Sequence, residues 1–259
     1  MMAQIIPLAE GTFTVDRSKK FIPFDPQHDR LQDRPKGSLL IEIQPFLVIA
    51  GSHYILLDTG LNLSNNQEFL LYQILKEKGI DPSQITHVLL SHLHKDHAGG
   101  ICSLHPDGSY RLNFPQAIYY VHEDELKYAL SHAQQNEGET GGDIASSYAA
   151  EEFELLFQSD QVMLLHDEGY IDTHIRYQLS GGHCPYHVVF WIQDQDEIIF
   201  YGGDVAPQYL QMKTRYVAKY DYDGRKSMEL RQQFAEQGKR EGWTFLFYHD
   251  VQRPVMKLI

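Results

Sequence analysis

One short segment, His92-Leu93-His94-Lys95-Asp96-His97, constrains this chain more than any other, because four metal-capable side chains fall within six residues. It follows the apolar run 87–91, which is short and bounded by polar residues and therefore predicts a buried strand. The four side chains would then lie on the loop that leaves the C-terminal end of that strand. Open α/β sheets place their ligands at this end.

The spacing within this segment suits two metal ions. His92 and His94 can point the same way from an extended backbone toward one ion. Asp96 and His97 lie about one turn further along and can face a second ion. Imidazole nitrogens suit zinc, and a carboxylate adds the negative charge that a pair of divalent cations needs. A polar loop that is merely rich in histidine is the alternative, and it explains this spacing less well.

Three later segments repeat the same arrangement. Gly181-Gly182-His183, Gly202-Gly203-Asp204 and His249-Asp250 each follow a predicted strand. Taken singly, each would be ordinary loop chemistry. Taken with the first segment, they predict that ligand-type side chains converge at one edge of a sheet.

Composition limits the class of protein. The 259 residues, 42% of them apolar, can bury a large core and predict a single domain over residues 1–259. The net charge of −13 argues against nucleic acid and anionic membranes as partners. There are two cysteines, no apolar segment of 18 residues and no signal peptide, so we expect a cytoplasmic protein. The histidines outside the motifs are expected to be surface or satisfied core groups: His28, His53, His87, His105, His122, His132, His166, His174 and His187.

Periodicity and turn residues predict two similar halves, each a sheet covered by helices. The first strands, 5–8 and 12–15, are expected to pair as a hairpin, and 16–37 and 134–143 are expected to be loops. The other predicted strands are 39–49, 53–57, 87–91 and 117–121, then a second set at 162–165, 175–179, 188–192, 198–201 and 244–248. The predicted helices are 66–78, 123–132, 146–157 and 225–240.

His92-x-His94-x-Asp96-His97, followed by His183, Asp204 and His249, resembles the metallo-β-lactamase superfamily over nearly the whole chain. The strand end Leu57-Asp58-Thr59-Gly60 belongs to the same resemblance. It implies an α/β fold, a four-layer αβ/βα sandwich of two mixed sheets with outer helices. It also implies that His92, His94 and His183 bind one zinc ion, that Asp96, His97 and His249 bind the other, and that Asp204 bridges them. Iron and manganese are the alternative metals.

Within the superfamily, the ligand spacing is most similar to the N-acyl-homoserine lactonase branch. That branch has a tyrosine three positions after the bridging aspartate, where this chain has Pro207. The nearest tyrosine, Tyr209, is therefore the candidate for a hydrogen bond to the oxyanion, and its alternative role is packing against apolar neighbours. Asp58 and Asp250 are candidates for orienting the ligand histidines.

The resemblance implies a hydrolase in which a zinc-held hydroxide opens a lactone or cleaves a carboxylic ester, for example an N-acyl-homoserine lactone. Asp96 or Asp204 would carry the proton to the leaving oxygen. The alternatives are a phosphoester or organophosphate hydrolase, an iron-dependent enzyme similar to persulfide dioxygenases, and an inactive metal-binding scaffold. The expected partner is a small-molecule ester or lactone, without nucleic acid or membrane, and a homodimer is possible.

Overall fold

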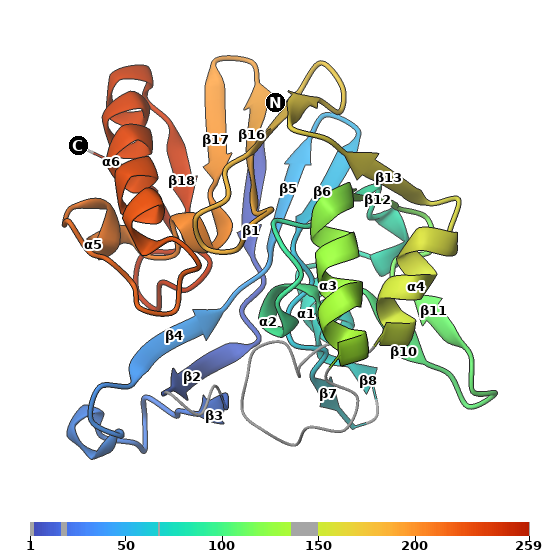
Figure 1. The fold of residues 1–259 in the computed structure, drawn as a ribbon. Helices are drawn as coiled ribbons and strands as arrows, with labels where there is room; N and C mark the ends of the chain where they lie inside the picture. The colour runs from blue at the N-terminus through green and yellow to red at the C-terminus, as the bar shows by residue number, and fades with distance from the viewer. Residues whose placement is uncertain (1–2, 17–19, 67, 136–149, 259) are drawn as a thin grey trace.

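The computed structural model of the protein describes residues 3–16, 20–66, 68–135 and 150–258 (Figure 1). Its first large sheet has six strands in the order β1-β5-β6-β9-β12-β13. Strands β6, β9, β12 and β13 run parallel, whereas β1, β5 and β6 pair antiparallel. The strands are β1 (Gln4–Pro7), β5 (Phe46–Ala50), β6 (His53–Leu57), β9 (His87–Leu89), β12 (Ile118–His122) and β13 (Val162–Leu165).

The second large sheet also has six strands, in the order β14-β15-β16-β17-β18-β19. Only β17 and β18 pair in parallel, and helix α6 (Gly224–Glu241) lies between them in the chain. The strands are β14 (Glu168–Tyr170), β15 (Ile175–Leu179), β16 (Val188–Asp194), β17 (Glu197–Tyr201), β18 (Thr244–Leu246) and β19 (Val255–Lys257).

Three apolar clusters place these sheets in layers. Because side chains alternate along a strand, Ile55 and Leu57 of β6 join the cluster between the two sheets, whereas Leu56 points to the helices on the other side. Helices α1 (Leu70–Glu77), α3 (Glu123–Gln135) and α4 (Ala150–Gln158) cover that outer face of the first sheet. Helices α5 (Tyr209–Met212) and α6 cover the second sheet (Figure 1). The predicted four-layer αβ/βα sandwich is confirmed.

Smaller elements join these layers. A three-stranded sheet has the order β3-β2-β4, formed by β2 (Gly11–Val15), β3 (Ile22–Pro23) and β4 (Leu39–Ile43). Two short hairpins pair β7 (Ser64–Asn65) with β8 (Glu68–Phe69) and β10 (Cys102–Leu104) with β11 (Tyr110–Leu112). The one-turn elements are α2 (Lys95–Ala98), η1 (Leu31–Asp33), η2 (Pro82–Gln84) and η4 (Gly203–Val205). Among the described residues, no helix has both the length and the apolar character needed to cross a membrane.

Several predicted strand pairings and sheet assignments were wrong. Strands 5–8 and 12–15 do not form a hairpin, because β1 pairs with β5 and β2 pairs with β4. The predicted strand 39–49 is divided into β4 and β5, which belong to different sheets. The break falls at Pro45, whose missing N–H cannot continue a strand ladder. The sequence analysis placed residues 162–165 in the second set of strands. This prediction was wrong, because β13 pairs with β12 and extends the first sheet.

Element boundaries also moved. The helix predicted over 66–78 begins only at Leu70, because β8 occupies the residues before it. The predicted loop 16–37 contains β3 and η1, and residues 17–19 lie outside the described residues. Most of the predicted loop 134–143 and the start of the predicted helix 146–157 also lie outside them.

Candidate metal centre

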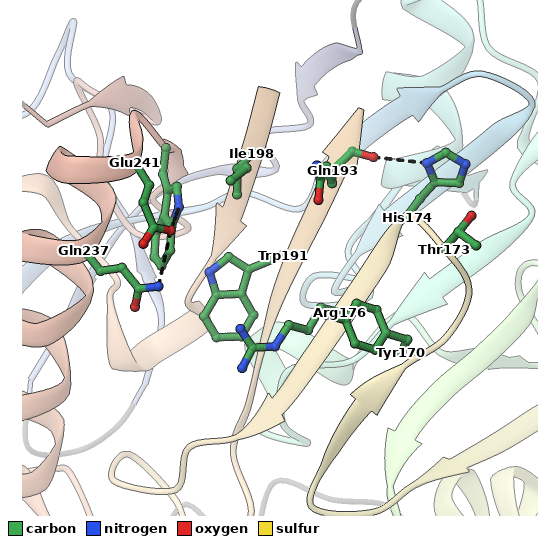
Figure 2. Close-up of a pocket in the computed structure, with 10 residues that line it drawn as sticks. Tyr170, Thr173, His174, Arg176, Trp191, Gln193, Ile198, Gln237 and Glu241 are labelled. Atoms are coloured by element: carbon green, nitrogen blue, oxygen red, sulfur yellow. Dashed lines mark hydrogen bonds between the residues drawn. The ribbon is translucent and has the colours of Figure 1, made fainter. Parts of the chain in front are cut away.

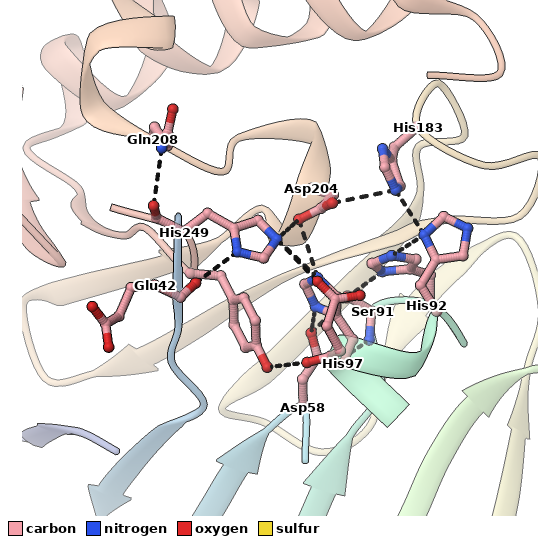
Figure 3. A network of polar contacts seen from close by, with 12 residues as sticks. Glu42, Asp58, Ser91, His92, His97, His183, Asp204, Gln208 and His249 are labelled. Carbon is pink, nitrogen blue, oxygen red and sulfur yellow. Dashed lines mark hydrogen bonds and ion pairs between the residues drawn. The ribbon is translucent and has the colours of Figure 1, made fainter. Parts of the chain in front are cut away.

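The predicted ligand residues gather at one edge of the sandwich (Figure 3). His92 follows β9, and His183 follows β15. Asp204 lies in η4, directly after β17, and His249 follows β18. The strand-end rule therefore brings together residues that are up to 157 positions apart in the chain.

Three imidazoles form the first group. His94 Nδ1 lies 3.0 Å from His92 Nε2 and 2.9 Å from His183 Nε2. Zinc–nitrogen bonds of about 2.0–2.1 Å place the nitrogens of a tetrahedral site at about this separation. The three nitrogens therefore have the arrangement of ligands around one ion.

The second group contains Asp96, His97 and His249, whose ligand-type atoms all lie within 4.8 Å of one another. His97 Nε2 and His249 Nε2 are 3.3 Å apart. Asp96 Oδ2 lies 3.6 Å from the first and 3.4 Å from the second. This group combines two imidazoles with one carboxylate, a donor set that suits a metal cation.

Asp204 stands between the two groups. Its Oδ1 lies 3.0 Å from His249 Nε2 and 3.2 Å from His97 Nε2, and its Oδ2 lies 3.3 Å from His183 Nε2. Oδ1 is buried, and none of its contacts has the geometry of a hydrogen bond. A buried carboxylate oxygen without a hydrogen-bond partner suits a position beside a cation.

The electrostatics of the two groups differ. Burial, followed by the neighbouring histidines, holds the pKa of His92 and of His94 well below its usual value, so both imidazoles are neutral and can bind metal. Burial also lowers the pKa of His97, but Asp204 and Asp96 outweigh it and raise that pKa well above its usual value. Burial opposes ionisation of Asp204, yet His249, His97 and His183 hold its pKa well below the usual range.

Asp58 orients the first motif, as the sequence predicted. Its Oδ2 accepts hydrogen bonds from His97 Nδ1 and from Ser91 Oγ, both at 2.7 Å, and a third from the Tyr201 hydroxyl. Because Ser91 Oγ donates its proton to Asp58, it accepts the proton of His92 Nδ1 at 2.9 Å. Asp58 has a backbone φ of 56°, in the left-handed region. Its contacts turn the Nε2 atoms of His92 and His97 toward the cluster.

The prediction for Asp250 was wrong. Its carboxylate accepts from the backbone N–H groups of Tyr209, Gln252 and Arg253, whereas His249 Nδ1 donates to the carbonyl of Glu42 at 2.8 Å. The sequence analysis also missed the partner of His183. That partner is Asp221, whose Oδ1 lies 2.8 Å from His183 Nδ1 and whose side chain is 1% exposed.

The ring of Tyr209 contacts residues outside the two ligand groups. Its ring packs against Phe247 at 6.0 Å between centroids, and Lys213 Nζ lies 4.4 Å from the ring centroid. Packing, the alternative role, is therefore the one that its contacts fit. Tyr220 was not selected from the sequence, yet its ring lies 6.1 Å from that of His183. Burial, and then the charges of Asp204 and Asp221, raise the pKa of Tyr220, which keeps its hydroxyl protonated.

Two glycines allow the chain to pass close to the ligands. Gly203 has a φ of 47°, and a Cβ there would lie 2.7 Å from His187 Nε2 and 2.8 Å from Ser91 Oγ. Gly182 has a φ of 89°, and a Cβ there would lie 2.8 Å from Ser227 Oγ. His187 itself is a satisfied core group, since its Nε2 accepts from the Asp204 N–H and its Nδ1 contacts Ser180 Oγ. The glycines thus have a steric reason to precede His183 and Asp204.

This set of imidazole and carboxylate donors suits metal ions. A model of the metallo-beta-lactamase superfamily matches residues 43–249. The chain belongs to that superfamily. No curated protein sequence matches this chain.

Solved structures share the fold at low sequence identity. A probable metal-dependent hydrolase from Staphylococcus aureus is 21% identical, with a TM-score of 0.71 over 96% of this chain and 89% of that one. AidC, a dizinc quorum-quenching lactonase in complex with a homoserine product, is 19% identical, with a TM-score of 0.73 over 98% and 89%. AbOPH, a hydrolase in the beta lactamase superfamily, is 24% identical, with a TM-score of 0.72 over 98% and 89%.

Proposed function

We propose that the chain is one hydrolase domain that uses two zinc ions to open a lactone or cleave a carboxylic ester. The observation that carries this proposal is Asp204, whose Oδ1 faces His97 and His249 while its Oδ2 faces His183. In this proposal His92, His94 and His183 hold one ion, Asp96, His97 and His249 hold the other, and Asp204 bridges them. Bound zinc ions supply Lewis acidity, which lowers the pKa of water to near neutrality and polarises a carbonyl oxygen.

The protein contributes fixed tautomers. His97 Nδ1 donates to Asp58, His183 Nδ1 to Asp221 and His249 Nδ1 to the Glu42 carbonyl. Each contact keeps a proton on Nδ1 and directs Nε2 at the cluster, where a bound metal ion would replace the second proton that Asp204 favours on these imidazoles. The rings therefore already face the cluster, and metal binding would require only the loss of the protons on Nε2.

Two carboxylates are placed to move a proton. Asp96 and Asp204 are 9% and 8% exposed, so they lie at the margin between the buried histidines and solvent. We propose that one of them takes a proton from water and delivers it to the leaving oxygen of the substrate. Tyr220, whose hydroxyl stays protonated, is our candidate donor of a hydrogen bond to the developing oxyanion, in place of Tyr209.

The fold neighbours favour a lactone as the substrate. Besides AidC, an N-acyl homoserine lactone hydrolase with N-hexanoyl-L-homoserine bound at its catalytic metal centre shares the fold at 18% identity and a TM-score of 0.64. The net charge of −13 fits a small neutral substrate better than a nucleic acid or an anionic membrane. We propose a small-molecule ester or lactone as the partner, and a cytoplasmic location on the basis of two buried free cysteines.

A substrate panel with metal analysis tests the proposal. The purified protein is assayed on an N-acyl-homoserine lactone, an aryl ester and a phosphodiester, and its bound metals are quantified. We expect about two zinc ions per chain, lactone or ester hydrolysis, and loss of both activity and metal in Asp204→Asn. Asp107→Asn is the matched control, because Asp107 is an exposed carboxylate that contacts only Ser109 and Arg111 among its described partners.

Three outcomes would contradict the proposal. Turnover of the phosphodiester alone would favour the phosphoester alternative. A single bound iron ion would favour the oxidoreductase alternative. Full activity in a folded, metal-depleted Asp204→Asn variant would exclude a binuclear mechanism.

A further inference from the structure

We propose that the amino ends of strands β6 and β9, opposite the candidate metal centre, hold a separate metal site. In this site His53, His87 and Asp172 bind one zinc ion. Their ligand-type atoms all lie within 4.8 Å of one another. The sequence analysis had assigned both histidines to surface or core roles. The structure brings them together with a carboxylate from a distant turn.

The site is distinct from the candidate catalytic centre. His53 is the first residue of β6 and His87 the first residue of β9, and these two strands are parallel neighbours. Their other ends lead to Asp58 and Ser91, beside the first cluster. At about 3.3 Å per residue, the five positions of extended chain from His53 to Asp58 span roughly 16 Å, so the two clusters lie at opposite ends of β6.

The contact between His53 and Asp172 suits an intervening ion. His53 Nδ1 is 3.8 Å from Asp172 Oδ2, which is too long for a hydrogen bond. The same nitrogen is buried and has no hydrogen-bond partner. An ion with bonds of about 2.0–2.2 Å to nitrogen and oxygen would span this gap and satisfy both atoms.

Asp172 is held in place by its other oxygen. Its Oδ1 accepts hydrogen bonds from the backbone N–H groups of His174 at 2.6 Å and Ile175 at 3.0 Å. These bonds fix the carboxylate in the turn between β14 and β15. Oδ2 is left facing His53.

His87 is fixed as a particular tautomer. Thr86 Oγ1 accepts from the Tyr54 N–H and donates to the Tyr54 carbonyl, so it can only accept from His87 Nδ1, which lies 2.8 Å away. The proton is therefore on Nδ1, and Nε2 keeps its lone pair for a cation. The ring of His87 also stacks on Tyr120, with 9° between their planes.

His174 lies next to His53. Its ring centroid is 5.6 Å from that of His53. Figure 2 shows its Nδ1 directed at the Gln193 carbonyl, which lies 3.2 Å away, beside a hollow of about 160 Å³. The contact to Gln193 places the proton on Nδ1 and leaves Nε2 available.

Two imidazoles and one carboxylate are a donor set that zinc binds well. The side chains of His53 and Asp172 are 27% and 29% exposed, so an ion can reach them from solvent. His53 and His87 belong to the first sheet, whereas Asp172 lies in a turn of the second. A bound ion would therefore connect the two sheets and stabilise the fold without taking part in hydrolysis.

Zinc binding to variants of the holoenzyme tests this site. The wild type, His53→Gln and Asp172→Asn are dialysed against the same free zinc concentrations, and the zinc per chain is measured. We expect each variant to bind about one ion fewer than the wild type and to keep its ester or lactone hydrolysis within about twofold, because the site lies outside the reacting groups. His28→Gln is the matched control, since His28 forms an exposed pair with Asp25 at 2.6 Å.

A crystal of the wild type soaked in zinc gives an independent measurement. We expect an anomalous-scattering peak between His53 and Asp172, separate from any peak near Asp204. Equal zinc content in the wild type and both variants, or an anomalous map without a peak at His53, would overturn the proposal. If the variants do not fold, the soaked crystal decides alone, and its result is independent of whether the protein hydrolyses lactones.

Discussion

Strands β6 and β9 carry metal-capable side chains at both ends, and the two ends differ in burial. At the carboxyl ends, His92 and His97 are fully buried, and Asp58 and Ser91 fix their proton positions. At the amino ends, His53 remains about one quarter exposed, and its Nδ1 has no hydrogen-bond partner. The ligands at the carboxyl ends are therefore shielded from solvent and oriented by hydrogen bonds, whereas His53 at the amino ends can be reached by an ion from solvent. The same pair of strands can thus support chemistry at one end and stabilisation at the other.

The largest expected effect is on hydrolysis, and it should distinguish the cluster at the carboxyl ends of β6 and β9 from the one at their amino ends. Asp204→Asn should lower hydrolysis by roughly 10²–10⁴-fold, because it removes a charge that faces both ligand groups and a candidate proton carrier. Steady-state kinetics on the best substrate of the panel measures this loss. A comparable loss of hydrolysis in His53→Gln would contradict this distinction, since it would mean that the amino ends also take part in catalysis.

The second effect is a pH dependence of the free energy of unfolding, caused by the burial of Glu10 near the carboxyl end of β6. Glu10 accepts a hydrogen bond from the Leu61 N–H, and burial raises its pKa from 4.5 to about 7. The folded protein therefore binds more protons than the unfolded chain between these values, so its stability falls as pH rises from about 4.5 to 7. The loss due to Glu10 is on the order of 3 kcal/mol. Urea unfolding at pH 5 and pH 8 should show a smaller fall in Glu10→Gln than in the wild type, and equal falls would exclude this origin.

The third effect concerns the carboxylate that holds His183. Asp221→Asn should weaken metal binding or activity by roughly 10–100-fold, because the proton on His183 Nδ1 loses its anionic acceptor. The free metal concentration needed for half-maximal activity measures this change. An unchanged metal requirement, with Asp107→Asn as the control, would reduce Asp221 to a packing role.

The smallest expected effect distinguishes two tyrosines. Tyr220→Phe should lower kcat by roughly tenfold with little change in KM, as expected for one lost hydrogen bond to a charged oxygen. Tyr209→Phe should leave both constants within about twofold, because the ring of Tyr209 packs against Phe247 and keeps those contacts. The reverse result would restore Tyr209 as the oxyanion donor.

The parts that the sequence predicted well are local or follow a general rule. His92 to His97 lie in one segment after one strand, and His183, Asp204 and His249 each lie after a strand of their own. Because the carboxyl ends of such strands face the same edge, their convergence could be expected without knowing any contact. The alternation of β6 side chains between the two apolar clusters, Leu56 in one and Ile55 and Leu57 in the other, likewise follows from the strand period.

The parts that failed depend on contacts between distant residues. Asp250 is adjacent to His249 in sequence, but its carboxylate turns toward the Tyr209 N–H. Asp221 comes 38 positions after His183, and nothing local marks it as the partner of that histidine. Strand β1 looked like half of a hairpin, yet its partner is β5, with paired residues 39 to 45 positions apart. Neighbourhood in sequence does not fix the direction of a side chain or the choice of a strand partner.

The backbone of Asp58 restricts which residues this position can accept. A left-handed φ costs most residues about 1 kcal/mol or more, and aspartate, asparagine and glycine tolerate it best. Glycine would relax the backbone but would remove the acceptor for Ser91, His97 and Tyr201, and asparagine would lack the negative charge. Mutational libraries designed to stabilise this protein should therefore leave codon 58 untouched, because a gain in thermal tolerance there would come at the expense of turnover.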